Sequence, residues 1–191
     1  MRRGEVLAGS KTALVTGASR GIGGCYALRL AALGYNVLMV ASGEEELEKT
    51  FQEVQSLNRG VWVRYYTKDM ATPSAAEELF AWTEAEGIKV DVLVNNAGVY
   101  HDRDFVDDSE AFNLLIMNLH MITPAMLIYY FAQEMAKRGK GYVLNMCSVT
   151  ADIAVQRLGS YGSTKAFLRN FSRSLYVEMK DKGVIITDMT P

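Results

Sequence analysis

The chain has 191 residues, of which 49% are hydrophobic and 22% charged, and its formal net charge at pH 7 is −2. A domain of this length buries roughly 70% of the surface that its unfolded chain exposes, so it can form a core without disulfide bonds or metals. The chain has no basic excess that would bind nucleic acid, and we expect no nucleic-acid partner.

The two cysteines, Cys25 and Cys147, lie far apart and lack the spacing of metal ligands. This pattern favours reduced thiols in a cytoplasmic protein and no metal site. The basic residues Arg2 and Arg3 are not followed by the apolar run of a signal peptide, and no uninterrupted apolar stretch is long enough to cross a bilayer. We therefore expect a cytoplasmic protein without a membrane partner.

Six short runs rich in branched or aromatic residues predict strands at residues 12–16, 36–40, 61–66, 90–95, 142–146 and 184–187. Segments with helical spacing lie between them, at residues 22–33, 44–57, 73–86, 109–138 and 161–182, and the fourth is expected to break near Pro124. Alternating strands and helices predict an α/β fold, with a mainly parallel sheet covered by helices on both faces. Without repeats or linkers, residues 1–191 form one predicted domain, and residues 1–10 form an N-terminal extension.

The first predicted strand runs directly into the segment TGASRGIG at residues 16–23 and then into a helix. In such a turn Gly17 reverses the chain, Gly21 lets the backbone approach a pyrophosphate, and Gly23 lets the helix pack closely on the sheet. This context predicts a dinucleotide site, and the alternative is a glycine-rich turn without a ligand. A phosphate-binding NTPase loop is excluded because no Gly-Lys-Ser/Thr follows.

The glycines of this turn are separated by three residues and then by one, and this spacing resembles the turn of the short-chain dehydrogenase/reductase family. Three further matches follow in order: NNAG at residues 95–98, Ser148 after the fifth strand, and YGSTK at residues 161–165. The resemblance covers essentially the whole chain from about Lys11 to Pro191. It implies a Rossmann-type doubly wound parallel sheet in three αβα layers, with strand order 3-2-1-4-5-6 and the site at the carboxyl ends of the strands.

The resemblance also implies a set of cofactor-binding residues. In the family, the Asn-Asn-Ala-Gly segment lies beside the cofactor, and an acid after the third strand, matched here by Asp69, contacts adenine. The set comprises Gly17, Ser19, Arg20, Gly21, Ile22, Gly23, Ser42, Asp69, Asn95, Ala97, Gly98, Tyr161 and Lys165.

The end of the second strand predicts which cofactor is preferred. An acid there would bind the ribose hydroxyls of NAD and repel the extra phosphate of NADP. Ala41 and Ser42 occupy the place, and Arg20 supplies a cation in the glycine turn. We therefore expect NADP(H) to be preferred, although Ser42 also tolerates NAD(H).

Four residues match the family's catalytic positions. Tyr161 and Lys165 are four residues apart on one face of a predicted helix. A free tyrosine has a pKa of about 10, and a nearby ammonium favours the phenolate, so Tyr161 is the expected general acid in reduction and general base in oxidation. Ser148 is expected to orient the substrate oxygen. Asn118 matches the family's asparagine, which holds a water for proton relay through Lys165.

The implied function is the interconversion of a small-molecule ketone and a secondary alcohol by hydride transfer. The alternatives are a non-catalytic nucleotide-binding or assembly protein on the same fold, or an incomplete fragment with little activity. Family members continue past the position of Pro191 with a substrate-covering segment and another strand, so the 191-residue chain is expected to bind cofactor weakly and turn over slowly.

Family members associate through the two long helices that carry Asn118 and Tyr161, which predicts a homodimer or homotetramer. Apolar residues available for this contact are Tyr129, Tyr130, Phe131, Phe167, Phe171 and Leu175. His101 and His120 are not spaced as a metal-binding pair. His101 follows the Asn-Asn-Ala-Gly turn, and it is either incidental or part of the wall of a substrate pocket.

Overall fold

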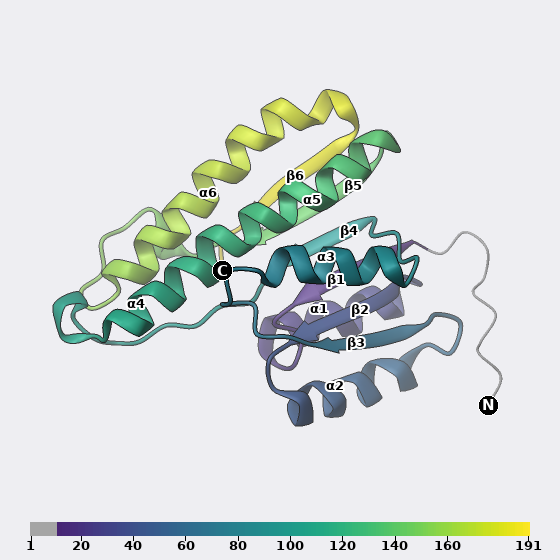
Figure 1. The fold of residues 1–191 in the computed structure, drawn as a ribbon, viewed down its shortest axis with the longest axis horizontal. Coiled ribbons are helices and arrows are strands. Elements are labelled where there is room, and N and C mark those ends of the chain that lie inside the picture. Colours follow the sequence, from purple (N-terminus) through teal and green to yellow (C-terminus); the bar gives the residue numbers. More distant parts are fainter. Residues whose placement is uncertain (1–10) are drawn as a thin grey trace.

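The computed structural model describes residues 11–191, and the expected extension of residues 1–10 lies outside the described residues. Six parallel strands form one sheet in the order β3-β2-β1-β4-β5-β6, which confirms the predicted order (Figure 1). The strands are β1 (Thr12–Thr16), β2 (Asn36–Ala41), β3 (Val63–Thr67), β4 (Val92–Asn95), β5 (Gly141–Met146) and β6 (Val184–Met189). The order reverses between β1 and β4, so the loops after these two strands diverge and leave a crevice at their carboxyl ends.

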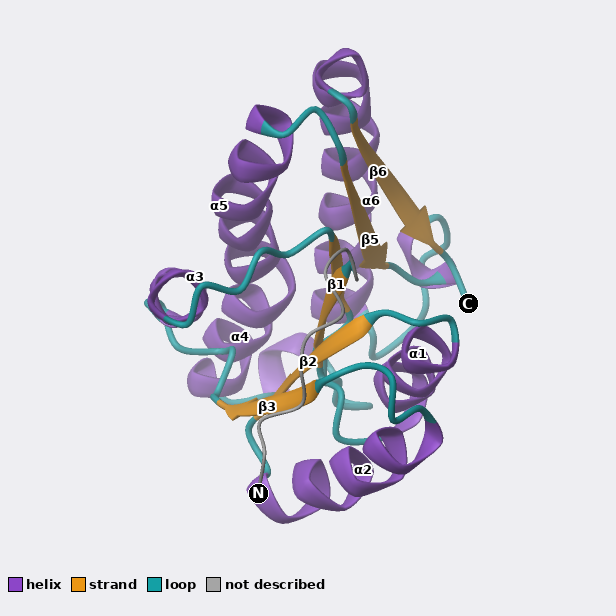
Figure 2. Ribbon diagram, turned by 90° about the vertical axis from the view of Figure 1, so that its right-hand side faces the viewer, coloured by secondary structure: helices purple, strands orange, loops and turns teal. Residues whose placement is uncertain are grey.

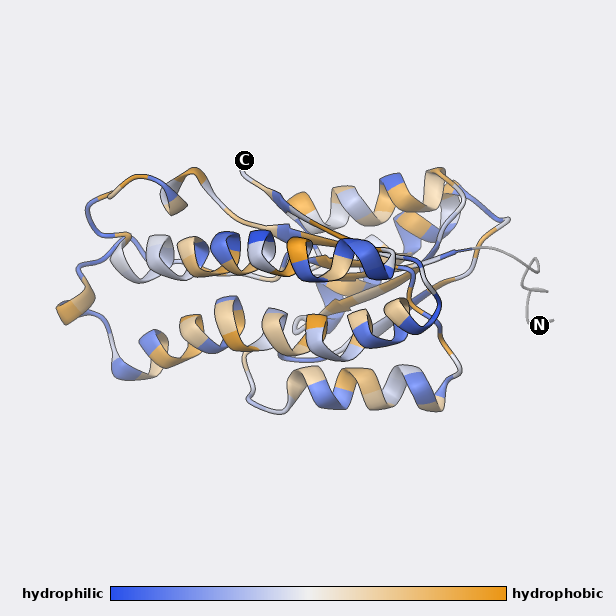
Figure 3. Cartoon of the chain, turned by 90° about the horizontal axis from the view of Figure 1, so that it is seen from above, coloured by the Kyte–Doolittle hydropathy of each residue, from blue (hydrophilic) through white to orange (hydrophobic). Residues whose placement is uncertain are grey.

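Helices connect consecutive strands. They are α1 (Gly21–Ala32), α2 (Glu44–Leu57), α3 (Ala75–Ala85), α4 (Glu110–Met117), α5 (Thr123–Lys137) and α6 (Gly159–Met179). Figure 2 shows α1 and α2 on one side of the sheet, and α3, α4 and α5 on the other. Hydrophilic and hydrophobic residues alternate along the helices, whereas the strands between them are largely hydrophobic (Figure 3).

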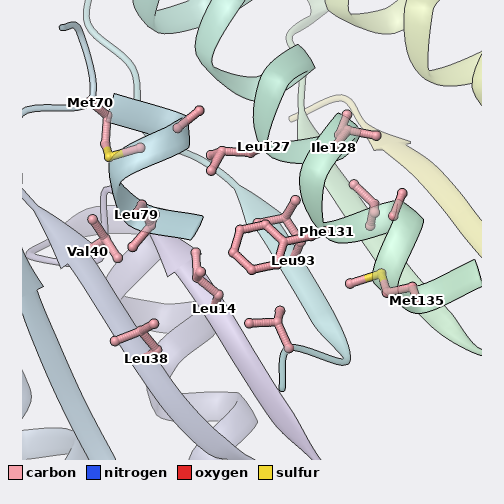
Figure 4. Packing of buried hydrophobic residues seen from close by; sticks show 14 of the residues in the cluster. Leu14, Leu38, Val40, Met70, Leu79, Leu93, Leu127, Ile128, Phe131 and Met135 are labelled. Atoms are coloured by element: carbon pink, nitrogen blue, oxygen red, sulfur yellow. The ribbon is translucent and has the colours of Figure 1, made fainter. Parts of the chain in front are cut away.

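The larger core lies between the sheet and the helices α3, α5 and α6. Leu14 and Leu93 from the central strands meet Leu79 of α3 and Leu127 and Phe131 of α5 in this core (Figure 4). All five side chains are at least 97% buried. On the opposite face, a smaller cluster joins strand residues to buried residues of α1 and α2. Burial of these strands on both faces explains why their sequences read as continuous apolar runs.

Helices cover both faces of the sheet, as expected, but on one face the cover over β5 and β6 is incomplete. On β5 and β6, Tyr142 and Ile185 are about 40% exposed, at 41% and 38% respectively. They occupy paired positions on the two strands, and the alternation of side chains places them on the face opposite Val143 and Ile186 of the main core. Within residues 11–191, the cluster beneath α1 and α2 extends across this face only as far as Leu144 of β5.

The helix expected to break near Pro124 is continuous. α4 and α5 are joined by a single π-helical turn, Asn118–Ile122, in which the Thr123 amide donates to the Asn118 carbonyl. Pro124 has no amide hydrogen, and its ring would clash with the carbonyl of His120 in a regular helix. The wider turn just before the proline absorbs this conflict, so the helix continues instead of breaking.

By length and composition alone, the continuous helix Glu110–Lys137 could cross a membrane. In this structure its apolar side instead packs on the sheet, through Leu127, Ile128, Phe131, Ala132 and Met135. Two of the residues expected on an external contact surface are also used internally. Phe131 is only 3% exposed, and the ring of Tyr130 stacks on that of Phe80.

Candidate active site

The glycine turn after β1 has the geometry that a dinucleotide requires. Gly17 and Gly21 have φ angles of +65° and +57°, which side-chain-bearing residues rarely adopt. A Cβ on Gly23 would lie 2.2 Å from the Gly17 carbonyl oxygen, whereas a Cβ on Gly21 would meet nothing within 4 Å. Gly23 therefore allows close packing, and Gly21 leaves the approach to the turn open. Arg20 makes no capping bond at the start of α1, so the amides of the first turn can bind an anion.

Hydrogen bonds of the Thr16 side chain of β1 and of the Asn96 side chain join the Asn-Asn-Ala-Gly segment to this turn. The Thr16 hydroxyl accepts hydrogen bonds from the amides of Asn96 (3.0 Å) and Ala97 (3.1 Å). The Asn96 side chain in turn donates to the carbonyls of Thr16 (3.0 Å) and Gly17 (3.2 Å). Asn96 was not among the sequence-predicted site residues, although it belongs to the same motif. It holds the two loops at the switch point together.

Asn95 lies behind the wall of the crevice rather than on it. Its side chain is 5% exposed and donates to Asn145 of β5 at 2.8 Å. Asn145 donates to the Ser172 hydroxyl at 2.8 Å, and Ser172 donates to the Leu168 carbonyl of α6. This buried polar chain joins β4, β5 and the helix that carries Tyr161. The geometry gives Asn95 a supporting position, and its predicted contact with cofactor stays a prediction.

A cleft of about 540 Å³ runs from the glycine turn to the carboxyl ends of β2, β3 and β4. The predicted cofactor residues that line it are Gly17, Ser19, Arg20, Ile22, Ser42, Asp69, Ala97 and Gly98. The other predicted cofactor residues, Gly21, Gly23, Asn95, Tyr161 and Lys165, are not part of its lining. The cleft therefore has the position and the lining expected for the adenosine end of a dinucleotide.

Two charged residues of this cleft were not predicted from the sequence. Glu46 of α2 lies 3.6 Å from the Arg20 guanidinium, and both side chains are exposed. Lys68 pairs with Glu78 of α3, and this hydrogen bond raises the pKa of Lys68. Neither pairing has a local signal in the sequence, because both depend on how the helices pack beside the sheet.

Lys165 is buried next to the predicted proton donor. Its side chain is 4% exposed, and its Nζ donates to the Met146 carbonyl at 2.7 Å and lies 5.7 Å from the ring centre of Tyr161. Burial lowers the pKa of Lys165 to about 8. A pKa near the working pH lets this group gain or lose a proton at little cost.

Ser148 follows β5 and lies at the same carboxyl end of the sheet. It is 93% buried, and its hydroxyl accepts a hydrogen bond from the Thr150 amide at 3.2 Å. A Cβ on Gly162 would lie 2.9 Å from the Thr150 carbonyl, so glycine allows the first turn of α6 to pack against the loop after Ser148. This contact brings the ends of β5 and α6 together, as the sequence pattern predicts. Tyr161 is half-buried there, with its ring edge-on to that of Tyr100.

Asn118 lies in the π-helical turn, half-buried, and this turn contacts α6. The predicted role of its side chain in holding a water stays a prediction. Cys147 is buried, as its position at the strand end predicts, and burial raises the pKa of its thiol to about 11. Among residues 11–191, no group of three His, Cys, Asp or Glu residues could hold a metal ion.

Three comparisons relate this geometry to known proteins. The profile of the family described as short chain dehydrogenase matches residues 11–191. The very-long-chain 3-oxoacyl-CoA reductase-B of Danio rerio is 32% identical over 187 residues, which make up 95% of this chain and 58% of that protein. The (S)-acetoin-forming diacetyl reductase of Staphylococcus epidermidis is 31% identical over 186 residues, or 95% of this chain and 70% of the relative. The chain thus spans little more than half the length of the Danio rerio reductase.

Solved structures of dehydrogenases also resemble this chain. The bulky-bulky ketone specific alcohol dehydrogenase from Comamonas testosteroni superposes with a TM-score of 0.89 at 29% identity, covering 95% of this chain and 72% of that one. A short-chain dehydrogenase from Sphingobium yanoikuyae in complex with NADPH has a TM-score of 0.89 at 27% identity, covering 95% of this chain and 70% of that one.

Proposed function

Because this chain belongs to the short-chain dehydrogenase family, we propose that it interconverts a ketone and a secondary alcohol with NADP(H). The observation that carries the proposal is that Tyr161 and buried Lys165 lie close together on α6, whose first turn packs against the loop after Ser148, beside a cleft shaped for a dinucleotide. A bound nicotinamide would supply or accept the hydride. The open approach at Gly21 and the uncapped start of α1 fit its pyrophosphate.

The protein's own residues would then handle the substrate oxygen. In reduction, Tyr161 donates its proton to that oxygen while the carbonyl carbon is reduced, and in oxidation it takes the proton back. The Ser148 hydroxyl donates a hydrogen bond to the same oxygen as negative charge develops on it. A charged Lys165 favours the phenolate left on Tyr161 by electrostatic attraction. The names of the relatives support a ketone substrate, including 3-oxoacyl-CoA reductase and diacetyl reductase.

The experiment that tests this proposal is NADPH oxidation measured against a panel of ketones. We expect Tyr161→Phe to lower kcat by at least about a hundredfold, since general acid catalysis of this kind contributes roughly 10²–10⁴ in rate. Cofactor affinity should stay nearly unchanged because the hydroxyl contributes little to ground-state binding. Tyr142→Phe is the matched control, because it removes a hydroxyl from an exposed residue at the opposite end of β5. Full turnover by the Tyr161→Phe variant would exclude the mechanism.

The preference for NADP(H) is part of the same proposal. Its support is the absence of an acid at Ala41 and Ser42, and the presence of Arg20 in the cleft. Glu46 weakens this support because its carboxylate already pairs with Arg20 and would repel a phosphate. We therefore expect a moderate preference for NADP(H), set by the balance of these charges.

A change at Ser42 tests this preference. Ser42→Asp should shift the ratio of dissociation constants toward NAD(H) by about tenfold or more, because an acid at the end of the second strand repels the 2′-phosphate and binds the ribose hydroxyls. Ser42→Asn is the control, because asparagine has nearly the same size as aspartate but carries no charge. Binding titrations with NADPH and NADH decide the outcome, and equal affinity of the wild-type chain for the two cofactors would contradict the proposed preference.

We also propose that the protein is a homo-oligomer. An apolar groove of about 210 Å³ lies between α5 and α6, lined by Ala125, Ile128, Tyr129, Ala132, Gln133, Phe171, Leu175 and Met179. Tyr129 is 58% exposed at its rim, and Phe167 on α6 is 36% exposed. A second copy of these two helices would cover this apolar surface.

A further inference from the structure

His120 is a buried imidazole that the proposed mechanism leaves without a role. It lies in the π-helical turn with 1% of its surface exposed. Burial, and to a smaller extent the positive charge of Lys165, lowers the pKa of His120 to about 3. The ring is therefore neutral near pH 7, and a neutral imidazole has one nitrogen that donates a hydrogen bond and one that accepts.

Its neighbours determine which nitrogen does which. The Val99 amide donates to Nε2 at 3.1 Å, so Nε2 is the acceptor and the ring hydrogen lies on Nδ1. Nδ1 lies 3.0 Å from the Thr164 hydroxyl, which therefore accepts. The Thr164 hydroxyl donates its own hydrogen to the Tyr161 carbonyl at 2.8 Å. A hydrogen-bond chain with one consistent direction thus joins the backbone of Val99 to the backbone of Tyr161.

The ring also fills the space between these two segments. It packs edge-on against the ring of Tyr161, with centroids 5.6 Å apart. On its other side, a Cβ added to Gly98 would lie 2.9 Å from Nε2, so the imidazole rests directly on the backbone of the Asn-Asn-Ala-Gly segment. Residues 98 and 99 line the dinucleotide cleft. His120 therefore contacts the cofactor side and the proton-donor side of the site at once.

We propose that His120 is a positioning residue that fixes Tyr161 relative to the cofactor-binding segment at Gly98 and Val99. This inference rests on the proposed function, because it assigns His120 the geometry of that reaction. A neutral ring suits the role: it donates toward α6 and accepts from the loop without placing a second positive charge beside Lys165. A misplacement of reacting groups by about 1 Å can lower a rate about a hundredfold, so one fixed spacer can have a large effect on turnover.

The kinetic test compares His120→Phe and His120→Gln with the wild-type protein. Phenylalanine keeps an aromatic ring but cannot make the hydrogen bonds of His120 to Val99 and Thr164. The glutamine amide still offers one acceptor oxygen and an NH₂ donor. We expect His120→Phe to lower kcat about tenfold or more and to increase the isotope effect with deuterated NADPH, because hydride transfer becomes slower relative to the other steps. His120→Gln should recover part of kcat. The KM for the ketone should change less than kcat.

A control variant separates positioning from loss of stability. Thr83→Val removes a buried hydroxyl that donates to the Phe80 carbonyl within α3, remote from the site. It should lower the melting temperature without changing kcat or the isotope effect below that temperature. If His120→Phe behaves in the same way, His120 is only a structural residue and the inference is wrong.

A spectroscopic test does not require activity. The chain contains two histidines, His101 and His120, so nitrogen NMR of labelled imidazoles resolves them readily. His120 should carry its hydrogen on Nδ1 and should not titrate between pH 5 and 8, and the exposed His101 gives a separate signal. A hydrogen on Nε2, or titration of His120, would overturn the inference even if the protein reduces ketones. A wild-type chain that shows the expected tautomer but reduces no ketone would instead refute the proposed function.

Discussion

Lys165 shows how a single residue can favour function at the expense of stability. Lys165 is 96% buried, and a hydrogen bond from its ammonium to the Met146 carbonyl partly compensates for lost hydration. The lowered pKa of about 8, compared with 10.5 for a free lysine, expresses this penalty. Each unit of such a shift corresponds to roughly 1.4 kcal/mol of differential stability. The site therefore retains a charge that the fold alone would not favour.

We predict that Lys165→Met abolishes turnover and raises the free energy of unfolding at pH 7 by about 1–3 kcal/mol, because it replaces a buried charge with an apolar chain of similar length. Chemical denaturation measures the stability, and an NADPH titration of the same variant should show weaker cofactor binding. A variant less stable than the wild-type chain at pH 7 would contradict the prediction.

The same penalty should depend on pH. Below pH about 8, Lys165 is charged in both the folded and the unfolded chain, so the penalty is complete. Between about 8 and 10.5, the unfolded chain binds the proton more tightly, and the contribution of Lys165 to stability improves as the pH rises. The stability difference between Lys165→Met and wild type should therefore shrink across this interval, and a difference that stays constant from pH 7 to 10 would contradict this explanation.

At the scale of elements, α1 illustrates how one turn serves both packing and binding. The helix starts at Gly21, within the glycine-rich segment of residues 16–23, and Gly23 and Gly24 are both buried in its first turn. A Cβ on Gly23 would collide with the Gly17 carbonyl and the Asn96 side chain. On Gly24 the nearest atom would be the Thr50 Cγ2 at 3.5 Å, an ordinary contact. Close packing therefore requires glycine at position 23, whereas position 24 has room for a methyl side chain.

We predict opposite effects for the two matched substitutions in this helix. Gly23→Ala should destabilise the fold by about 2 kcal/mol or more and weaken cofactor binding, since backbone atoms must move to make room. Gly24→Ala should stabilise it by about 0.5–1 kcal/mol, because alanine favours the helix and loses less chain entropy on folding. Thermal or chemical unfolding of both variants checks the pair. Equal destabilisation by the two substitutions would show that the close approach at Gly23 is unimportant.

At the scale of the whole molecule, the two faces of the sheet differ in how completely they are covered. The core beneath α3, α5 and α6 extends over all six strands on one face, whereas α1 and α2 cover only part of the other face. Apolar residues are exposed in two separate regions, among others, of the described chain: the groove between α5 and α6, and the open face of β5 and β6. Of these, only the groove was anticipated as a contact surface.

The proposed oligomer can be tested with a pair of charge substitutions. Tyr129→Glu places a carboxylate at the rim of the groove, and Val177→Glu places one on α6 at a residue that is similarly exposed but does not line it. Light scattering at micromolar concentration should give a dimer or tetramer for the wild-type chain and for Val177→Glu, and a smaller species for Tyr129→Glu. A monomeric wild-type chain would refute the proposal.

Much of this protein could be predicted from the sequence because the relevant signals are local. Branched residues and helical spacing identified all six strands and the helices between them, since the periodicity of a segment reflects which of its faces is buried. The alternation of strands and helices predicts the parallel arrangement. The strand order was predicted from four ordered motifs that resemble those of the short-chain dehydrogenase/reductase family. The sequence also indicated eight of the eighteen residues that line the cleft.

Other features were decided only by tertiary structure, because they depend on residues far apart in the chain. Asn96 bonds to Thr16 across 80 positions, and His120 reaches both Val99 and Thr164. The sequence presented His120 as an isolated histidine, and the π-helical turn that holds it appeared only as a helix break near Pro124. Burial converts such residues into fixed hydrogen-bond partners, since a buried polar group must find a partner within the protein. Local pattern therefore determined the elements and their motifs, and packing decided which side chains meet between them.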